Sequence, residues 1–198
     1  KVHVLIMAEG ATSRNHVRDP KRSSKELSLL KYAAQSAGDT LGVSSVKLLD
    51  FPDNRMDSLD RLEVIKAIEK EIEKIKPHTV VTHHAGDVNI DHRIIHEAVV
   101  TACRPQPGHS VLLLLAFEVV SSTEWQPAGS NIVFQPNWFE DVSSTFNRKI
   151  IALKAYQSEM RDWPHPRSVK NIEYIAKTRG SSIGCNFAEG FMLLRLIQ

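Results

Sequence analysis

Runs of apolar residues and stretches of helical periodicity alternate along the first half of the chain. Apolar residues cluster at positions 2–8, 46–49 and 79–82, in runs short enough to predict three strands. Between these runs, apolar residues recur every three or four positions, which predicts two amphipathic helices. Their apolar faces carry Leu27, Leu30, Ala34 and Ala37 in the first helix and Leu62, Ile65, Ile68, Ile72 and Ile75 in the second.

Local signals mark the ends of these helices. Ser23 and Glu26 have the Ser-x-x-Glu spacing of a capping box, so the first helix is expected to start there. Gly38 stands where a C-terminal cap is expected, and Pro77 ends the second helix. A third helix is predicted over residues 94–102, after the third strand.

The second half of the chain continues the alternation with longer polar connections. Strands are predicted at 111–120 and 131–134, and helices at 139–156 and 169–176. The first of these helices has an apolar face of Val142, Phe146, Ile150 and Leu153. Strands that alternate with helices predict an α/β fold with a Rossmann-like, mostly parallel sheet and helices on both of its faces. The whole chain is expected to form a single domain.

Composition narrows the class of protein further. The chain has 198 residues, 42% of them hydrophobic, and a net charge of +2 without a long run of one sign, so nucleic acid is not an expected partner. The longest apolar run, at 111–117, is too short to cross a membrane. Cys103 and Cys185 lie far apart and form no CxxC pair, which predicts free thiols and a cytoplasmic protein.

One segment concentrates chemically active side chains. Residues 83–96, HHAGDVNIDHRIIH, follow directly on the strand predicted at 79–82. The segment from Gly10 to Arg14 follows the first strand in the same way. In open parallel sheets, ligands bind beyond the carboxyl ends of the strands, so both segments are candidate site elements. Imidazole and carboxylate together are the usual ligands of zinc.

The individual residues of this segment allow different interpretations. His92 and His96 have the i, i+4 spacing of a chelating pair, and His83 and His84 could add further imidazoles. His96 also lies inside an apolar helical run, where packing alone would explain it. Asp87 and Asp91 could equally cap the helix that follows them.

The pattern Asp-x-Asn-x-Asp-His-Arg after a strand resembles the second signature of the LmbE-like, or PIG-L, family of metal-dependent N-deacetylases. Other segments resemble that family in the same order along nearly the whole chain. They are LIMAEGATSR at 5–14, SSTEW at 121–125, YQSE at 156–159, Arg179-Gly180 and AEGF at 188–191.

This resemblance implies the LmbE-like deacetylase fold and hydrolysis of the N-acetyl group of an amino sugar or sugar-nucleotide by a metal-activated water. It implies a divalent metal, zinc above all, with His92 as a ligand. Asn89 and Asp91 are assigned to catalysis: Asn89 stands where many relatives have a histidine that polarises the carbonyl, and Asp91 would orient an imidazole. Arg14, Asp87 and Glu124 are assigned to substrate binding, with an exposed loop arginine and an ordinary fold residue as the alternatives for Arg14 and Glu124.

The chain departs from the family in one respect. The first signature, Ala-His-Pro-Asp-Asp-Glu, is absent, and the His165-Pro166 pair is followed by Arg167-Ser168 instead of two acids. The chain also starts at Lys1, directly before its first predicted strand. The resemblance therefore implies that the family's first strand and helix, with most of its metal ligands, are missing from this sequence.

Three functions remain open from the sequence. The first is a sugar N-deacetylase with a small N-acetylated sugar as substrate and no membrane partner. The second is a non-catalytic protein of the same fold that binds a sugar or nucleotide-sugar. The third is a different metal hydrolase that takes its ligands from His83, His84, His92 and His96. A homo-oligomer is left open.

Overall fold

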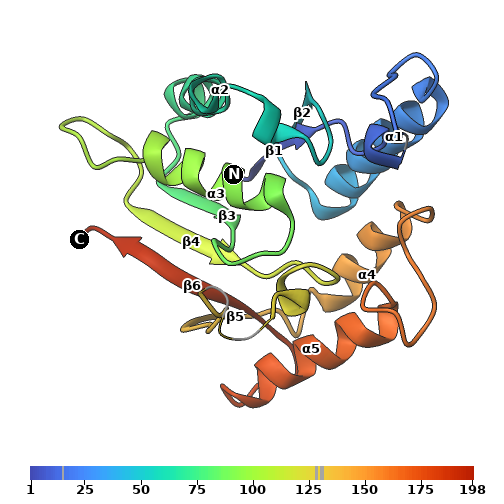
Figure 1. Cartoon of the computed structure of the whole chain (residues 1–198). Coiled ribbons are helices and arrows are strands. Elements are labelled where there is room, and N and C mark those ends of the chain that lie inside the picture. Colours follow the sequence, from blue (N-terminus) through green and yellow to red (C-terminus); the bar gives the residue numbers. More distant parts are fainter. Residues whose placement is uncertain (15, 128, 130–131) are drawn as a thin grey trace. The chain divides into compact units, whose positions relative to one another are not determined.

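The computed structural model describes residues 1–14, 16–127, 129 and 132–198. The chain folds into two compact units, each built from two separate stretches of sequence (Figure 1). The first unit comprises Lys1–Met56 and Asp141–Phe187, and the second comprises Asp57–Glu140 and Ala188–Gln198. That the whole chain forms a single domain stays a prediction.

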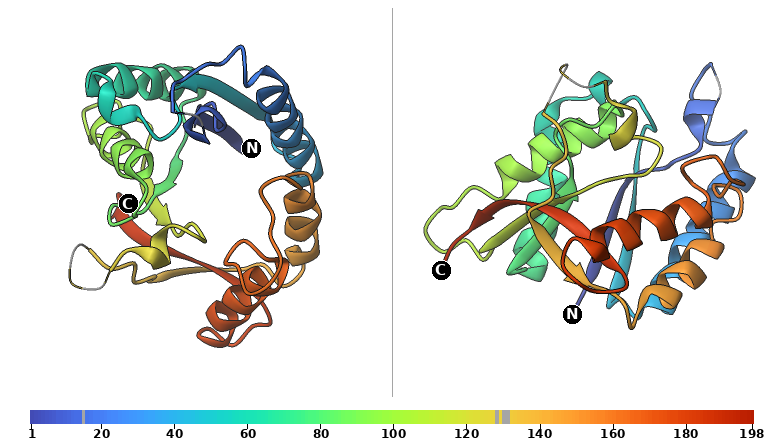
Figure 2. Two further views of the ribbon diagram at one scale, coloured as in Figure 1. Left: turned by 45° about the vertical axis from the view of Figure 1, so that its right-hand side comes forward. Right: turned by 90° about the horizontal axis from the view of Figure 1, so that it is seen from below.

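A parallel pair of strands forms the centre of the first unit. Strand β1 (His3–Ala8) pairs with β2 (Ser45–Phe51), and α1 (Ser24–Leu41) makes the crossover between them. Helix α1 packs against α4 (Phe146–Lys154), as Figures 1 and 2 show. The remaining elements of the unit are the 3-10 helix η1 (Thr12–Arg14) and helix α5 (Val169–Ser181).

The ends of α1 differ from the sequence prediction. Ser23 is the N-terminal cap residue, but its side chain makes no capping hydrogen bond, so the predicted capping box does not form. The C-terminal cap is Gly42, with φ of 73°, and not Gly38. Gly38 lies inside the helix instead. Glycine is needed at this position because a side chain would collide with β2: an added Cβ would be 2.5 Å from Cγ2 of Val46.

The second unit contains a four-stranded sheet in the order β3-β4-β6-β5. Strand β3 (Thr79–His83) runs parallel to β4 (Leu113–Phe117), and β4 runs antiparallel to β6 (Ala188–Leu196). Strand β5 (Trp138–Asp141) ends at the boundary with the first unit.

Helices and short turns complete this unit. Helix α2 (Arg61–Ile75) packs against α3 (Ile90–Ala102), and α3 also contacts β3. The 3-10 helix η3 (Thr123–Trp125) follows β4, and η2 (Met56–Ser58) precedes α2. Among the described residues, every helix is too short or too polar to cross a bilayer.

The predicted α/β class is confirmed, with a parallel pair of strands in each unit and the antiparallel pairing of β4 with β6 in the second. Several predicted bounds were wrong. Residues 132–134 are irregular instead of a strand, and Asn131 lies outside the described residues. Phe139 belongs to β5, so the helix expected at 139–156 is the shorter α4. Helix α5 runs on through Arg179-Gly180, and Val81 in the strand expected to be buried is 46% exposed.

Candidate functional site

Asn89 sets the start of helix α3 and therefore the position of His92. Its backbone is extended, and its side-chain oxygen accepts hydrogen bonds from the backbone N–H groups of Asp91 (2.8 Å) and His92 (3.4 Å). A side chain that caps the first turn satisfies amides that have no partner within the helix. This cap explains why α3 begins at Ile90, four residues before the predicted start at 94.

Asp87 is the buried centre of the loop between β3 and α3, with an exposed fraction of 0%. Its carboxylate accepts hydrogen bonds from the backbone N–H of Asn89 (2.8 Å) and from the hydroxyls of Ser122 and Thr123, the second at 2.8 Å. Thr123 Oγ1 accepts in turn from the N–H of Val119 (2.8 Å). Asp87 therefore joins the loop after β3 to the segment after β4.

The His92 ring is held between this carboxylate and a second histidine. Its Nδ1 lies 3.2 Å from Asp87 Oδ1, and its ring stacks on His83 with centroids 4.1 Å apart and an interplanar angle of 17°. His83 in turn contacts Phe117 of β4 at 4.9 Å. The His92 side chain remains 18% exposed. Because Nδ1 faces Asp87, Nε2 on the opposite edge of the ring is the nitrogen that can accept a proton or bind a cation.

The surroundings fix the charges of two of these groups. Burial by itself raises the pKa of Asp87, but the contact with His92 and the hydrogen bonds from Ser122 and Asn89 outweigh it and lower the pKa to about 2. Burial above all, and the charge of His92 in addition, lower the pKa of His83 to about 3. At neutral pH, Asp87 is therefore an anion and His83 is neutral.

The other two histidines of the loop serve the fold. His84 is 2% exposed, with Nε2 at 2.8 Å from the carbonyl oxygen of Ile132 and its ring edge-on to Phe134. His96 has Nδ1 2.7 Å from the backbone carbonyl of His83. In the described part of the chain, no group of three or more histidine, cysteine or acidic side chains could hold a metal ion. The four-histidine metal site considered from the sequence is therefore not formed.

The remaining acidic candidates lie on either side of this cluster. Asp91 is buried in the first turn of α3. Glu124 is exposed, and its carboxylate accepts hydrogen bonds from the backbone N–H groups of Ser121 (2.6 Å) and Ser122 (3.2 Å). Glu124 thereby stabilises the turn that brings the Ser122 hydroxyl to Asp87.

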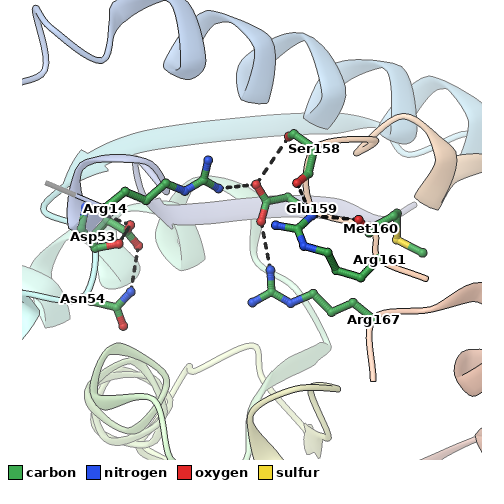
Figure 3. A network of polar contacts seen from close by, with 9 residues as sticks. Arg14, Asp53, Asn54, Ser158, Glu159, Met160, Arg161 and Arg167 are labelled. Carbon is green, nitrogen blue, oxygen red and sulfur yellow. Dashed lines mark hydrogen bonds and ion pairs between the residues drawn. The ribbon is translucent and has the colours of Figure 1, made fainter. Parts of the chain in front are cut away.

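Arg14 belongs to the first unit and to a different set of contacts. Its guanidinium forms an ion pair with Glu159, which also binds Arg167 at 3.0 Å (Figure 3). The preceding residue, Ser13, donates a hydrogen bond from its hydroxyl to Asp53. Five of the six predicted site residues thus lie together in the second unit, and the sixth, Arg14, lies in the first.

Sequence reasoning missed several residues that build these two clusters. Ser122 lies in the SSTEW segment and Glu159 in the YQSE segment, so both segments were identified, but the partners of these side chains were not. His83 was considered as a metal ligand and instead packs against His92. No local signal could have revealed these pairings, because they join positions far apart in the sequence.

Comparison with known proteins decides the family. Residues 1–103 match the PIG-L family model, described as GlcNAc-PI de-N-acetylase, which is more than half of the chain. The chain belongs to the PIG-L family. A similar protein is the probable N-acetyl-alpha-D-glucosaminyl L-malate deacetylase 2 of Bacillus cereus, 24% identical over 130 residues. The match covers 65% of this chain and spans 56% of that protein.

Solved structures agree with the PIG-L assignment at the level of the fold. The N,N'-diacetylchitobiose deacetylase of Pyrococcus horikoshii superposes with a TM-score of 0.69 at 18% identity, covering 98% of this chain and 73% of that one. The 4-carboxy-2-hydroxymuconate hydratase of Pseudomonas putida gives a TM-score of 0.72 at 19% identity, covering 99% and 85%. One fold therefore serves a deacetylase and a hydratase, so the reaction must be argued from the site.

The PIG-L resemblance implies a divalent metal, and the described residues fit it only in part. A histidine that turns one ring nitrogen to a carboxylate and keeps the other for the ion is the usual arrangement of a metal ligand, and His92 with Asp87 has that form. Catalytic zinc normally takes three protein ligands. The described donors provide no such group, so they do not make a zinc site by themselves.

Proposed function

We propose that the chain hydrolyses the N-acetyl group of an amino sugar or sugar-nucleotide. Membership of the PIG-L family supports the substrate class. The observation that carries the proposal is the His92–Asp87 pair after β3, because an imidazole oriented by a buried carboxylate is a prepared functional group.

Within this proposal, His92 contributes one imidazole to a divalent metal, zinc in the first place. Asp87 orients the ring from its buried position, a role that its zero exposure supports better than the substrate contact expected from the sequence. The Asn89 side-chain oxygen is occupied by the helix, so its amide N–H group is the part that can polarise a substrate carbonyl. Asp91 keeps its proposed place in catalysis.

Substrate binding is proposed for Arg14 through its guanidinium and for Glu124 through the turn that it stabilises. The substrate is a small N-acetylated sugar. The two cysteines are free thiols, which agrees with the cytoplasmic location that we propose.

The alternative is a non-catalytic protein that binds a sugar or nucleotide-sugar. The observation that favours it is the lack of a three-ligand metal group among the described residues. A binding protein of this kind would retain the substrate contacts and would not need His92 to bind a metal.

An acetate-release assay separates the two functions. The full-length product of the gene is incubated with N-acetylglucosaminyl L-malate and with N,N'-diacetylchitobiose in the presence of zinc, and acetate is measured by a coupled assay. We expect acetate from the unaltered protein and a loss of at least about 100-fold in His92→Ala, the usual scale for a group that acts in the transition state. His78→Ala, an exposed histidine on the loop before β3, is the matched control.

Calorimetry with the same sugars completes the test. Sugar binding without acetate release, unaffected by His92→Ala, would establish the binding protein in place of the hydrolase. Absence of both binding and acetate would defeat both functions.

A further inference from the structure

The two carboxylate oxygens of Asp87 have different partners. Oδ1 accepts hydrogen bonds from the backbone N–H of Asn89 (2.8 Å) and from the hydroxyl of Ser122. The same oxygen lies 3.2 Å from Nδ1 of His92. Oδ2 accepts a hydrogen bond from the hydroxyl of Thr123 at 2.8 Å. One oxygen therefore faces the His92 ring, and Thr123 holds the other.

The contacts of Thr123 fix the direction of its hydroxyl hydrogen. Its Oγ1 accepts a hydrogen bond from the backbone N–H of Val119 at 2.8 Å, and an N–H group can only donate. The ionised carboxylate of Asp87 can only accept, so the hydrogen of the hydroxyl is directed at Oδ2. Thr123 thus connects the main chain just after β4 to the carboxylate that faces His92.

The turn that carries Thr123 is held by its own hydrogen bonds. The backbone N–H groups of Ser122 and Thr123 donate to the carbonyl of Val119, at 3.2 and 2.9 Å. The carboxylate of Glu124 accepts from the N–H of Ser122 at 3.2 Å. Both residues that donate hydroxyls to Asp87 are buried, with Ser122 5% and Thr123 9% exposed. Donors fixed in this way can hold a functional group in a precise geometry.

An aspartate carboxylate needs a second contact because its last torsion angle is soft. The χ2 torsion of aspartate has a broad, two-fold distribution instead of three narrow wells. Contacts at Oδ1 alone would let the carboxylate plane tilt, whereas the hydrogen bond from Thr123 to Oδ2 opposes this rotation and keeps Oδ1 opposite Nδ1 of His92. The partner of one ring nitrogen determines which nitrogen carries the hydrogen, so the same contact determines the tautomer of His92.

We propose that Thr123 is a positioning residue: its hydroxyl fixes the plane of the Asp87 carboxylate, which keeps the hydrogen of His92 on Nδ1 and leaves Nε2 for the reaction. The inference rests on the proposed deacetylase function for the part that His92 plays in that reaction. It gives the SSTEW segment a role at the site through Thr123, to which no role was assigned from the sequence.

Matched substitutions separate the hydroxyl of Thr123 from the shape of its side chain. Thr123→Val removes the hydroxyl and nearly keeps the volume, whereas Thr123→Ser keeps the hydroxyl and loses the methyl group. Thr82→Val is the control, because Thr82 of β3 is 3% exposed and its Oγ1 has no hydrogen-bond partner in the part of the chain that the structure describes. Thermal unfolding shows which variants are folded, and Thr123→Ala replaces Thr123→Val if the latter is not.

NMR spectroscopy measures the tautomer of His92 directly. The full-length product of the gene is labelled with ¹⁵N-histidine and freed of metal with EDTA, and two-bond ¹H–¹⁵N correlation spectra are recorded at pH 8. The spectrum of His92→Ala identifies the signals of His92. We expect a single tautomer with hydrogen on Nδ1 in the unaltered protein, in Thr123→Ser and in Thr82→Val, and a mixture of tautomers in Thr123→Val. A mixture in the unaltered protein, or a single Nδ1 tautomer in Thr123→Val, would overturn the proposal.

Kinetics test whether this positioning matters for the reaction. With N-acetylglucosaminyl L-malate and zinc, Thr123→Val should lower kcat by about 10- to 100-fold and leave KM nearly unchanged, the usual effect of removing a group that orients a functional imidazole. Thr123→Ser should restore most of kcat, and Thr82→Val should equal the unaltered protein. Equal losses in Thr123→Val and Thr123→Ser would refute the role of the hydroxyl and leave packing as the function of Thr123.

Failure of the proposed function would be recognised separately. If the unaltered protein released no acetate, the deacetylase function would be defeated, whereas the NMR spectra would still decide whether Thr123 positions His92.

Discussion

Nδ1 of His92 lies 3.2 Å from Oδ1 of Asp87, and the Asp87 carboxylate is completely shielded from solvent. A buried anion is stable only when hydrogen-bond donors surround it, and Asp87 has the hydroxyls of Ser122 and Thr123 and the N–H of Asn89. The pair therefore couples the stability of the loop to the orientation of the ring. Changes at Asp87 should affect both.

Replacing Asp87 should destabilise the protein, in a way that depends on pH. Asp87→Ala leaves three buried donors without an acceptor and should lower the free energy of unfolding by about 3 kcal/mol. Asp87→Asn keeps an oxygen but loses the charge, and a pKa lowered from 3.8 to about 2 corresponds to about 2 kcal/mol. Urea unfolding monitored by circular dichroism measures the free energy of unfolding of both variants.

The pH dependence has a definite sign. The folded-state pKa of Asp87 lies below its unfolded value, so its contribution is complete above about pH 4 and is lost as the pH falls towards 2. The difference between the unaltered protein and Asp87→Asn should therefore be constant from about pH 5 to 7 and shrink below pH 4. A constant difference down to pH 2 would mean that the carboxylate charge does not stabilise the fold.

Local patterns predicted the parts of the fold that depend on neighbours in sequence. Helix α2 was placed from its repeating isoleucines, and β1 and β2 were placed from short apolar runs. Strand β6 was not predicted as a strand. Part of it, at 188–191, was identified only through the family resemblance. Gly38 was misassigned because the close approach of Val46 is a tertiary contact, invisible to any local rule.

The candidate site follows the same division. The loop at 83–96 was found because its histidines and acids stand together after a strand. The roles of the individual residues in this loop could not be predicted. Asp87 and Ser122 are 35 positions apart, and the capping hydrogen bond of Asn89 depends on where α3 starts. Glu159 had no visible role until folding brought Arg14 to it.

The position of Gly38 against β2 predicts that alanine is harmful inside helix α1. Alanine normally favours a helix by about 1 kcal/mol over glycine, but here the added Cβ would lie 2.5 Å from Cγ2 of Val46. We expect Gly38→Ala to lower the free energy of unfolding by about 1 to 3 kcal/mol, the usual cost of overpacking. Val46→Ala removes the colliding methyl group, so the cost should shrink in the double variant, and an unchanged cost would exclude the collision as its cause.

Burial of Cys103 predicts a thiol that does not react in the folded protein. Cys103 is 0% exposed, and burial outweighs the opposing charge of Arg195 and raises the pKa of the thiol to about 11. Since the thiolate is the reactive form, iodoacetamide at pH 8 should modify Cys185 first and Cys103 only after unfolding. Mass spectrometry of timed samples, with a urea-treated control, measures the two rates. Modification of both at equal rates in the native protein would contradict the buried position of Cys103.

Asn89 allows the structural and catalytic roles of one side chain to be separated. Asn89→Ala removes the cap of α3 and should lower the free energy of unfolding by about 1 kcal/mol. Asn89→Asp retains the capping oxygen and places a negative charge at the helix N-terminus, so its stability should stay close to that of the unaltered protein. It also loses the amide N–H that we propose to polarise the substrate carbonyl, and acetate release should fall about 100-fold.

The two variants should therefore differ in stability but not in activity if the proposal for Asn89 holds. Asn89→Asp should be stable and inactive, whereas Asn89→Ala should be both less stable and inactive. Thermal unfolding and the acetate assay are run on the same preparations, so that folded protein is compared with folded protein. Full activity in Asn89→Asp would show that Asn89 serves only as the cap, and that the carbonyl must be polarised by another group.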